Sequence, residues 1–300
     1  MAMQATERTE EFIESSPLLG DAERLRERAR AEGYLFFRDL LPKDALLNLR
    51  RQMLEVCGKA GWLDDSAPLE DGIARPGFRI IESLKDEWLK VYLELQKIRD
   101  FHALALHENL IDVFRKVFGE PVLPHSRNIC RVIFPQSQTY TTPPHQDHIH
   151  IGGTEETWTT WTPVGDCPSE LGGLALVPRS HTQGLLPSHE AYGAGGRGVE
   201  VPPEAIWHTG ELECGDVLIF HSLNVHQGRD NNTEDRLRLS LDFRYQPASH
   251  PIRSDSMLPH NLWNWQVTWD EIYAEWEATD PVKYYWKDSK LNLVPGREDK

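Results

Sequence analysis

The chain has few cysteines, and no two of them stand at a metal-binding or redox spacing. Cys57, Cys130, Cys167 and Cys214 are the only four in 300 residues, and none belongs to a CxxC pair. Zinc knuckles and disulfide frameworks need cysteines in close pairs or in sets at short spacings. We therefore expect neither kind of site, and we expect four buried, reduced thiols.

Long apolar segments and an excess of basic residues are also missing. No apolar run approaches the roughly 18 residues of a membrane-spanning helix, and residues 1–14 are too polar and acidic for a signal peptide. The formal net charge is -15, whereas a nucleic-acid-binding surface needs a basic patch. We expect a cytoplasmic protein that binds neither membranes nor nucleic acid and acts on a small molecule.

The pattern of residues changes near position 121. Residues 1–20 are polar and are expected to form an arm, and residues 21–300 are expected to form a single domain. Residues 21–120 are mainly helical in pattern. Residues 121–247 hold short β-prone segments between clusters of Gly, Pro, Asn and Asp, at 129–134, 157–163, 174–177, 217–220 and 237–245. Many short strands with irregular connections predict a β-sandwich or jelly roll.

Caps and helix breakers set the limits of the elements before residue 121. The predicted elements are a helix from Asp21 to Glu32 ended by Gly33, a strand at 34–37, a helix from Pro42 to near Gly58, a loop at 62–80, and helical periodicity over 81–118 with a break around Arg99-Asp100.

Aromatic residues are concentrated in the C-terminal extension, residues 248–300. They are Trp263, Trp265, Trp269, Tyr273, Trp276, Tyr284, Tyr285 and Trp286. Aromatic side chains bury a large apolar area, so we expect these rings to cover one face of the sheet. A substrate surface or the contact of a homodimer is the alternative. A helix is predicted from Asp270 to Glu277.

A histidine and an aspartate stand two positions apart in the stretch Pro143-Pro144-His145-Gln146-Asp147-His148. Because side chains alternate faces along an extended strand, His145 and Asp147 are expected on the same side, within reach of one ion. A second imidazole from a distant strand would complete a set of two histidines and one carboxylate, which leaves the other positions of Fe(II) open. His226 is the candidate for that ligand.

His221 is the alternative third ligand, because it also follows a predicted strand. His226 is favoured since a strand rich in arginine comes after it. If the chain stays regularly extended, His148 and His150 lie on the face opposite to His145. We therefore expect those two beside the site or in solvent rather than on the metal.

The arginine-rich strand has two chemically different faces. One face is apolar, with Leu237, Leu239, Leu241 and Phe243, and the other carries Arg236, Arg238, Ser240, Asp242 and Arg244. Burying the second face requires paired ions. A dicarboxylate co-substrate meets that need, because a guanidinium binds a carboxylate with two parallel hydrogen bonds and a nearby serine adds a third. The alternative is a solvated ladder that pairs with itself through Asp242.

Taken in order, these motifs resemble the phytanoyl-CoA dioxygenase family of Fe(II)/2-oxoglutarate oxygenases. The resemblance extends from Gly33-Tyr34-Leu35-Phe36-Phe37 to Tyr245. It rests on His145-Gln146-Asp147, Trp161-Thr162-Pro163, the run from Gly172 to His181, Gly215-Asp216-Val217, His226, Asn231 and Arg238. The ordered set is specific to the family but not to any substrate.

The resemblance implies a mainly β fold with flanking helices and a double-stranded β-helix core. It implies that His145, Asp147 and His226 hold Fe(II), that Arg238 binds the distal carboxylate of 2-oxoglutarate, and that Trp161 packs near this co-substrate. The reaction would consume O2 and release succinate and CO2. Hydroxylation of an unactivated C–H bond is the expected outcome, although desaturation, ring closure and epoxidation use the same iron chemistry.

Two positions near these residues qualify the resemblance. Arg236 is the alternative to Arg238 if the arginine-rich strand is aligned with the family pattern two residues earlier. Some members carry a serine two residues after the distal histidine, where this chain has Gly228. We therefore expect one hydrogen bond to the co-substrate to be absent or to come from Ser240. Halogenases of the family replace the carboxylate ligand by a small residue. Because Asp147 is present, we do not expect halogenation.

Residues 182–212 are rich in glycine and proline and are a candidate lid, with a surface insertion as the alternative. Leu185, Tyr192, Trp207 and the segment 62–80 are candidates for the lining of the substrate pocket. The sequence does not identify the substrate.

Two other functions would use part of the same pattern. A non-catalytic jelly-roll binding protein would keep the apolar strands but would not need three metal ligands and an arginine. A zinc or manganese cupin-type isomerase or hydrolase could use the three ligands, yet it would not need Arg238 and Ser240.

Overall fold

The computed structural model describes the chain except for residues 1–6, 84, 137–139, 263–264, 288 and 297–300. Its centre consists of two β-sheets. The larger has the order β2-β10-β5-β12-β3, with β4 also paired to β12; these strands are β2 (Tyr34–Phe37), β3 (Val122–Pro124), β4 (Ile129–Ile133), β5 (Trp158–Pro163), β10 (Val217–His221) and β12 (Arg238–Pro247). The smaller has the order β1-β9-β6-β11, formed by β1 (Arg8–Glu11), β6 (Leu174–Leu176), β9 (Ile206–Thr209) and β11 (His226–Gly228).

Side chains from both sheets share one buried cluster, so the sheets pack face to face. The cluster includes Phe36, Trp161 and Phe220 of the larger sheet and Leu174 and Leu176 of the smaller one. Two packed sheets of short strands are the jelly-roll arrangement that the sequence predicts. The expected mainly β fold with flanking helices is confirmed.

Strand β12 separates the apolar core from the polar interior. Leu239, Leu241 and Phe243 belong to the largest buried cluster, which also contains the apolar residues of the helices. The opposite face is turned towards the smaller sheet, and Arg238, Ser240, Asp242 and Arg244 on it are buried as well. The interpretation of this face as a solvated ladder is therefore wrong.

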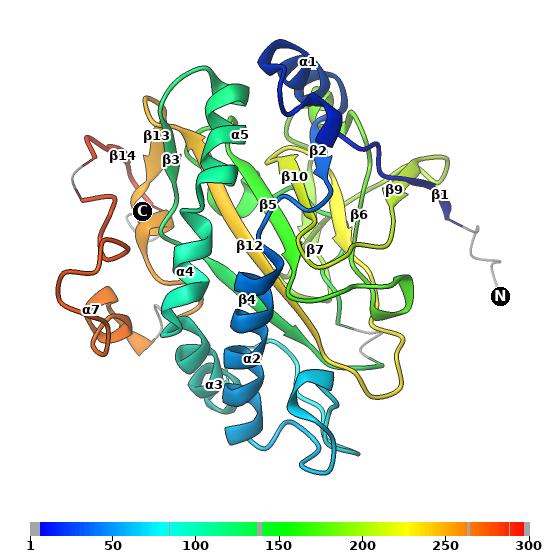
Figure 1. The fold of residues 1–300 in the computed structure, drawn as a ribbon. Helices are drawn as coiled ribbons and strands as arrows, with labels where there is room; N and C mark the ends of the chain where they lie inside the picture. Colours follow the sequence, from blue (N-terminus) through cyan, green and yellow to red (C-terminus); the bar gives the residue numbers. More distant parts are fainter. Residues whose placement is uncertain (1–6, 84, 137–139, 263–264, 288, 297–300) are drawn as a thin grey trace.

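The helices form a layer over the outer face of the larger sheet (Figure 1). They are α1 (Ala22–Glu32), α2 (Lys43–Lys59), α3 (Asp86–Gln96), α4 (Arg99–Ala105) and α5 (Glu108–Phe118). The caps of α1 are those predicted: Asp21 accepts a hydrogen bond from the backbone of Arg24, and Gly33 adopts a left-handed conformation with φ of 76°. The third helix starts at Asp86 rather than at residue 81, because Glu82 extends instead to an ion pair with Arg131.

Several strands are too short for their side-chain alternation to be visible in the sequence. Strands β1, β3, β9 and β11 have three or four residues each. Strand β1 lies within the segment 1–20 that was expected to be an arm, and it pairs in parallel with β9. Residues 1–6 of that segment lie outside the described residues.

The aromatic rings of the C-terminal extension pack mainly on the helices. Trp269, Tyr273 and Trp276 surround the imidazole of His102 on α4, at centroid distances of 5.5–6.2 Å. The extension also contains β13 (Pro251–Arg253), η5 (Ser254–Met257), α7 (Trp269–Ile272) and β14 (Asn292–Val294). The predicted helix from Asp270 to Glu277 is shorter than expected. Trp263 lies outside the described residues.

The segment 182–212 is partly a hairpin and partly core. Strands β7 (Ser188–Glu190) and β8 (Arg197–Val199) pair antiparallel, with a glycine-rich tip between them. Strand β9, at the end of the segment, belongs to the smaller sheet. The prediction of a lid therefore does not extend to β9, and a surface insertion does not describe the whole segment.

The four cysteines are buried and free, as expected. In the part of the chain that the structure describes, no helix combines the length and the apolar character that crossing a membrane requires.

Two buried histidines predict that acid destabilises the protein. Burial lowers the pKa of His102 to about 4 and that of His125 to about 3, from an ordinary value of 6.5. Below pH 6.5 the unfolded chain takes up these protons and the folded chain does not, so stability is complete above pH 6.5 and decreases as the pH falls towards 4. Each histidine should lower the free energy of unfolding by about 2 kcal/mol between pH 7 and pH 5.

Urea unfolding at both pH values measures this effect. In His102→Gln the decrease in the free energy of unfolding between pH 7 and pH 5 should be smaller by about 2 kcal/mol, the contribution of one histidine. His189→Gln, at an exposed position of the hairpin, is the matched control and should keep the full loss. An unchanged pH dependence in His102→Gln would contradict the assignment.

Candidate active site

The two histidines proposed from the sequence lie on facing chain segments. His145 and His226 form an isolated antiparallel bridge, with His145 N donating to His226 O over 2.9 Å and His226 N donating to His145 O over 3.0 Å. Their ring centroids are 4.1 Å apart. Strand β11 begins at His226, which places its ring between the two sheets.

Asp147 reaches the histidines by a turn rather than along a strand. It has helical backbone angles and stands directly before the short helix α6 (His148–Ile151). The expectation of an extended strand through this stretch is therefore wrong beyond His145. The side chain of Gln146 fixes the turn by donating to Leu223 O over 2.7 Å and accepting from Leu186 N over 2.8 Å.

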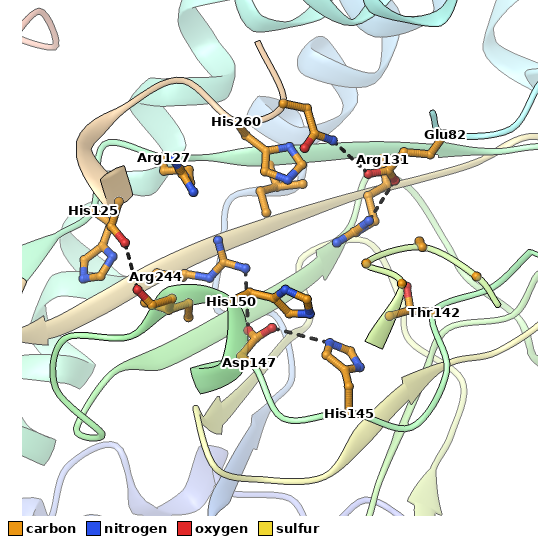
Figure 2. Close-up of a pocket in the computed structure, with 18 of the residues that line it drawn as sticks. Glu82, His125, Arg127, Arg131, Thr142, His145, Asp147, His150, Arg244 and His260 are labelled. Atoms are coloured by element: carbon orange, nitrogen blue, oxygen red, sulfur yellow. Dashed lines mark hydrogen bonds and ion pairs between the residues drawn. The ribbon is translucent and has the colours of Figure 1, made fainter. Parts of the chain in front are cut away.

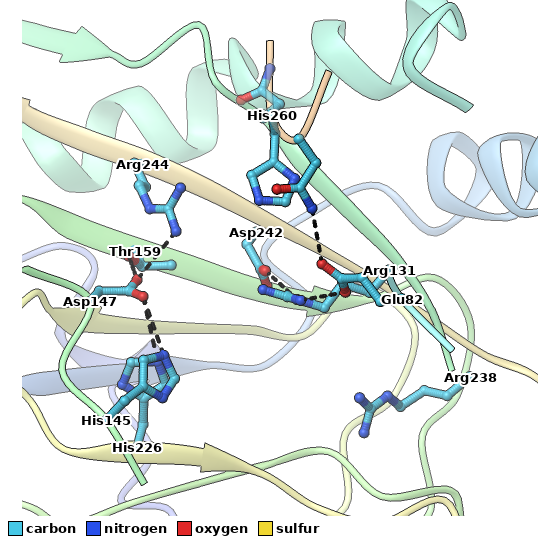
Figure 3. Close-up of polar contacts among 12 residues, drawn as sticks. Glu82, Arg131, His145, Asp147, Thr159, His226, Arg238, Asp242, Arg244 and His260 are labelled. Atoms are coloured by element: carbon cyan, nitrogen blue, oxygen red, sulfur yellow. Dashed lines mark hydrogen bonds and ion pairs between the residues drawn. The ribbon is translucent and has the colours of Figure 1, made fainter. Parts of the chain in front are cut away.

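One carboxylate oxygen faces both imidazoles (Figure 3). Asp147 Oδ1 lies 3.5 Å from His145 Nε2 and 3.8 Å from His226 Nε2, and the three possible ligand atoms lie within 4.8 Å of one another. All three residues are buried. Among the described residues, this is the one group of three or more histidine, cysteine, aspartate or glutamate side chains close enough to share a metal ion.

Backbone carbonyls fix which nitrogen of each histidine carries the proton. His145 Nδ1 donates to Pro143 O over 2.9 Å, and His226 Nδ1 donates to Asn224 O over 3.0 Å. Because a carbonyl can only accept, Nδ1 holds the proton and the lone pair of each Nε2 faces Asp147. Burial and the neighbouring His145 lower the pKa of His226 to about 3, so its ring is neutral.

Asp147 is held in its ionised form by its neighbours. The hydroxyl of Thr159 on β5 donates to Asp147 Oδ2 over 2.5 Å, and Arg244 Nη2 on β12 lies 3.7 Å from the same oxygen. Burial alone would raise the pKa of Asp147, but the guanidinium of Arg244 holds it well below its usual range. Oδ1 is left facing the histidines.

The other histidines do not belong to the three-residue group. His221, the alternative ligand, accepts from Leu223 N with its Nδ1 and has its Nε2 3.9 Å from Glu156. It is not part of the three-residue group. The turn at Asp147 ends the regular strand and brings His150 to the same cavity as His145, with ring centroids 5.9 Å apart. His150 therefore lies beside the site and outside the three-residue group, as expected.

A small cavity runs from the histidines to Arg238. Its lining includes His226, Trp161, Gly228 and Arg238. Arg238 is 4% exposed, and its Nη1 donates to the carbonyls of Gly172 and Arg229, each over 3.0 Å. Gly172 has φ of 71°, and a Cβ there would lie 2.3 Å from a backbone oxygen, so this carbonyl depends on glycine.

Two buried polar atoms near this cavity have no hydrogen-bond partner among the residues that the structure describes. They are Nε of Arg238 and Oγ of Ser240. Buried donors without partners are rare in folded proteins and point to a ligand. Arg236, the alternative to Arg238, is exposed and precedes β12, so the structure does not bring it to the cavity.

A larger cavity of about 540 Å³ opens beside His145 and Asp147 (Figure 2). The sequence did not indicate most of its lining, which includes Glu82, His125, Arg127, Arg131, His150, Arg244, Arg253, Asp255 and His260, together with the hairpin tip at residues 193–196. The expected lining residues lie elsewhere: Leu185 and Tyr192 are exposed, and Trp207 is buried in a separate cluster. Of the segment 62–80, only Ile80 reaches a neighbouring cavity.

Comparison with known proteins identifies the family. Residues 29–239, which are 211 of the 300 residues, match the family model described as phytanoyl-CoA dioxygenase (PhyH). The chain belongs to this family. The phytanoyl-CoA dioxygenase fold and the buried ligand set together make the protein a non-haem iron, 2-oxoglutarate-dependent dioxygenase.

Individual relatives agree with the phytanoyl-CoA dioxygenase assignment. The chain is 28% identical over 272 residues to a 1-deoxypentalenic acid 11-beta-hydroxylase of Streptomyces exfoliatus, covering 85% of this chain and 91% of that protein. A second hydroxylase of the same name, from Streptomyces arenae, is 29% identical with the same coverage.

Solved structures show the same fold. The carbocyclase SnoK from nogalamycin biosynthesis, described as non-heme and alpha-ketoglutarate-dependent, has a TM-score of 0.54 at 18% identity, covering 81% of this chain and 92% of that one. EctD from S. alaskensis has a TM-score of 0.52 at 16% identity, covering 84% of each chain.

Proposed function

We propose that the protein hydroxylates an unactivated C–H bond of a small organic substrate, with iron held by His145, Asp147 and His226. The observation that supports this most strongly is the convergence of two Nε2 lone pairs and one carboxylate oxygen in a buried site. Two neutral imidazoles and a carboxylate on one side of Fe(II) leave the remaining positions for co-substrate and oxygen. Hydroxylation is proposed because both Streptomyces relatives are hydroxylases.

The co-substrate is proposed to lie in the small cavity between the histidines and Arg238. The unpartnered Nε of Arg238 and the unpartnered hydroxyl of Ser240 supply donors for the distal carboxylate of 2-oxoglutarate. The three carbonyls that accept from Nη1 keep the guanidinium in one orientation. Trp161 would pack against the carbon chain, since it lines the same cavity and is buried.

The bound iron and 2-oxoglutarate supply the oxidation of the C–H bond, with release of succinate and CO2. The residues of the chain position the reactants. The carbonyls behind His145 and His226 hold the imidazoles in the protonation state that can ligate. Thr159 orients the carboxylate of Asp147 through its hydrogen bond, Arg244 places a positive charge beside it, and Phe220 and Trp161 supply apolar lining to the small cavity.

Removal of the Thr159 hydroxyl tests this positioning role. Thr159→Val should weaken Fe(II) binding by about 10- to 100-fold, because Asp147 loses the hydrogen bond that fixes its carboxylate. Anaerobic titration with Fe(II) gives the affinity. Thr159→Ser keeps a hydroxyl and should restore most of it. Equal affinity in the valine variant and the unaltered protein would contradict the role of Thr159.

The proposed function itself is tested by the chelate of iron and co-substrate. Anaerobic addition of Fe(II) and 2-oxoglutarate should give a weak visible charge-transfer band, and oxygen should then convert 2-oxoglutarate to succinate. Succinate formation across a panel of small organic compounds identifies those that stimulate turnover. A metal site that gives neither band nor succinate would overturn the proposal and favour a cupin-type isomerase, hydrolase or binding protein.

A further inference from the structure

The larger cavity is lined by arginines although the chain as a whole is acidic. Arg127, Arg131, Arg244 and Arg253 line it, in a protein of net charge -15. Arg244 and Arg253 stand beyond residue 239, where the match to the family ends. The family model therefore covers Arg127 and Arg131 but not Arg244 and Arg253.

Two of these arginines have carboxylates that account for their charge. Arg131 donates to Asp242 and to Glu82, each over 2.8 Å, and forms a buried three-residue network. Arg253 binds both oxygens of Asp255 through its Nε and Nη2. Neither guanidinium needs a ligand to balance its charge.

The carboxylate nearest to Arg244 is that of Asp147, which is the candidate metal ligand. Arg244 is 7% exposed, and its nearest acidic atom, Asp147 Oδ2, lies 3.7 Å from Nη2, beyond hydrogen-bond distance. Its Nε has no hydrogen-bond partner among the residues that the structure describes. Figures 2 and 3 show its side chain reaching across the cavity wall towards Asp147. A buried guanidinium with unused donors is costly unless an anion meets it.

The carboxylates that line the two cavities are already used by other groups. Among the described residues, Glu82 and Asp242 bind Arg131, Asp255 binds Arg253, and Asp147 is the candidate metal ligand. The arginines also act on His260, whose pKa is held well below its usual range first by burial and then by Arg131, Arg127 and Arg244.

We propose that the substrate is a carboxylate and that Arg244 receives its carboxylate group. This inference rests on the proposed function, since it takes Asp147 as an iron ligand and Arg238 as the co-substrate arginine. A carboxylate fits the planar fork of a guanidinium, and it supplies acceptors for a buried Nε that has no partner among the described residues. The group would lie at the end of the cavity next to the iron, because Arg244 borders Asp147.

Benzoate and benzamide test this proposal as probes of equal size. With Fe(II) and 2-oxoglutarate saturating and oxygen excluded, benzoate cannot take the place of the co-substrate. Ligand-observed NMR or calorimetry should then show benzoate binding about 10-fold or more tightly than benzamide, as expected for charge-assisted hydrogen bonds. Arg244→Gln should reduce the ratio to near one, and Arg244→Lys, which keeps the charge without the fork, should give an intermediate value.

The charge-transfer band is the internal control. Because Arg244→Gln also removes the positive charge beside Asp147, Fe(II) and 2-oxoglutarate are added to that variant until its band is complete, so that both are bound when the probes are compared. Arg51→Gln, on the exposed side of α2, should keep the band and the full preference for benzoate. The proposal is overturned if benzoate binds no better than benzamide, including the case in which neither binds, or if Arg244→Gln keeps the preference. Loss of the band in the unaltered protein would instead refute the proposed function.

Discussion

Replacing His226 with alanine is expected to abolish turnover and to weaken Fe(II) binding. Loss of a residue that only hydrogen-bonds to a metal ligand lowers metal affinity by about 10- to 100-fold, and loss of the ligand itself should lower it further. The reason is geometric. His226 supplies one of two Nε2 lone pairs that face Asp147 Oδ1, and the described residues offer no other histidine at that position. Succinate formation should fall by about 1,000-fold or more, and the charge-transfer band should disappear in an anaerobic titration.

His221→Ala is the matched control for that variant. His221 is also a buried histidine at the end of a strand, but its Nε2 lies towards Glu156 rather than Asp147. It should keep its iron affinity and its band, whatever it loses in stability. Added imidazole should partly restore the band of His226→Ala, because the deleted ring leaves space for it. Equal loss of iron in both histidine variants would contradict the choice of His226.

The fold could be predicted where the sequence pattern is local. The cap at Asp21, the left-handed Gly33 and the alternation along β12 each depend on neighbours within a few residues, and the structure has all three. Strand β11 has only three residues, too few for alternation to show, and it exists because it pairs with β6. Short strands of this kind depend on tertiary pairing that no sequence window contains.

The candidate site shows the same division. The sequence predicted that His145, Asp147 and His226 lie together, and the structure brings them together, but by a different backbone. The expected strand gives way to a turn at Asp147, because the bridge between His145 and His226 ends there and α6 begins. The two-residue spacing was informative although the strand that it implied does not form.

The larger cavity could not be predicted from the sequence, because its charged network is assembled from distant segments. Arg131 stands in an apolar strand segment, and its partners Glu82 and Asp242 are 49 and 111 residues away. Arg244 was recognised only as one member of a polar face. The length of β12 separates it from Arg238, because the strand places Arg244 beside the proposed iron ligands and Arg238 at the far end of the small cavity.

Replacing Arg238 with glutamine is the second large expected effect. A guanidinium that makes two charge-assisted hydrogen bonds to a carboxylate contributes about 3–6 kcal/mol, so the KM for 2-oxoglutarate should rise by about 100-fold or more. The iron ligands are unchanged, so Fe(II) affinity should stay within a few-fold and much of kcat should return at saturating co-substrate. Initial rates of succinate formation across a range of 2-oxoglutarate concentrations separate the two parameters.

The variant Arg236→Gln tests whether Arg236 or Arg238 binds 2-oxoglutarate. Arg236 is exposed and stands before β12, so its loss should leave the KM for 2-oxoglutarate within about two-fold of that of the unaltered protein, as for most surface substitutions. Glutarate and succinate, which share the distal carboxylate, should compete with 2-oxoglutarate in Arg236→Gln but poorly in Arg238→Gln. If Arg236→Gln raised the KM steeply and Arg238→Gln did not, the buried guanidinium would have a structural role, and the co-substrate would lie outside the small cavity.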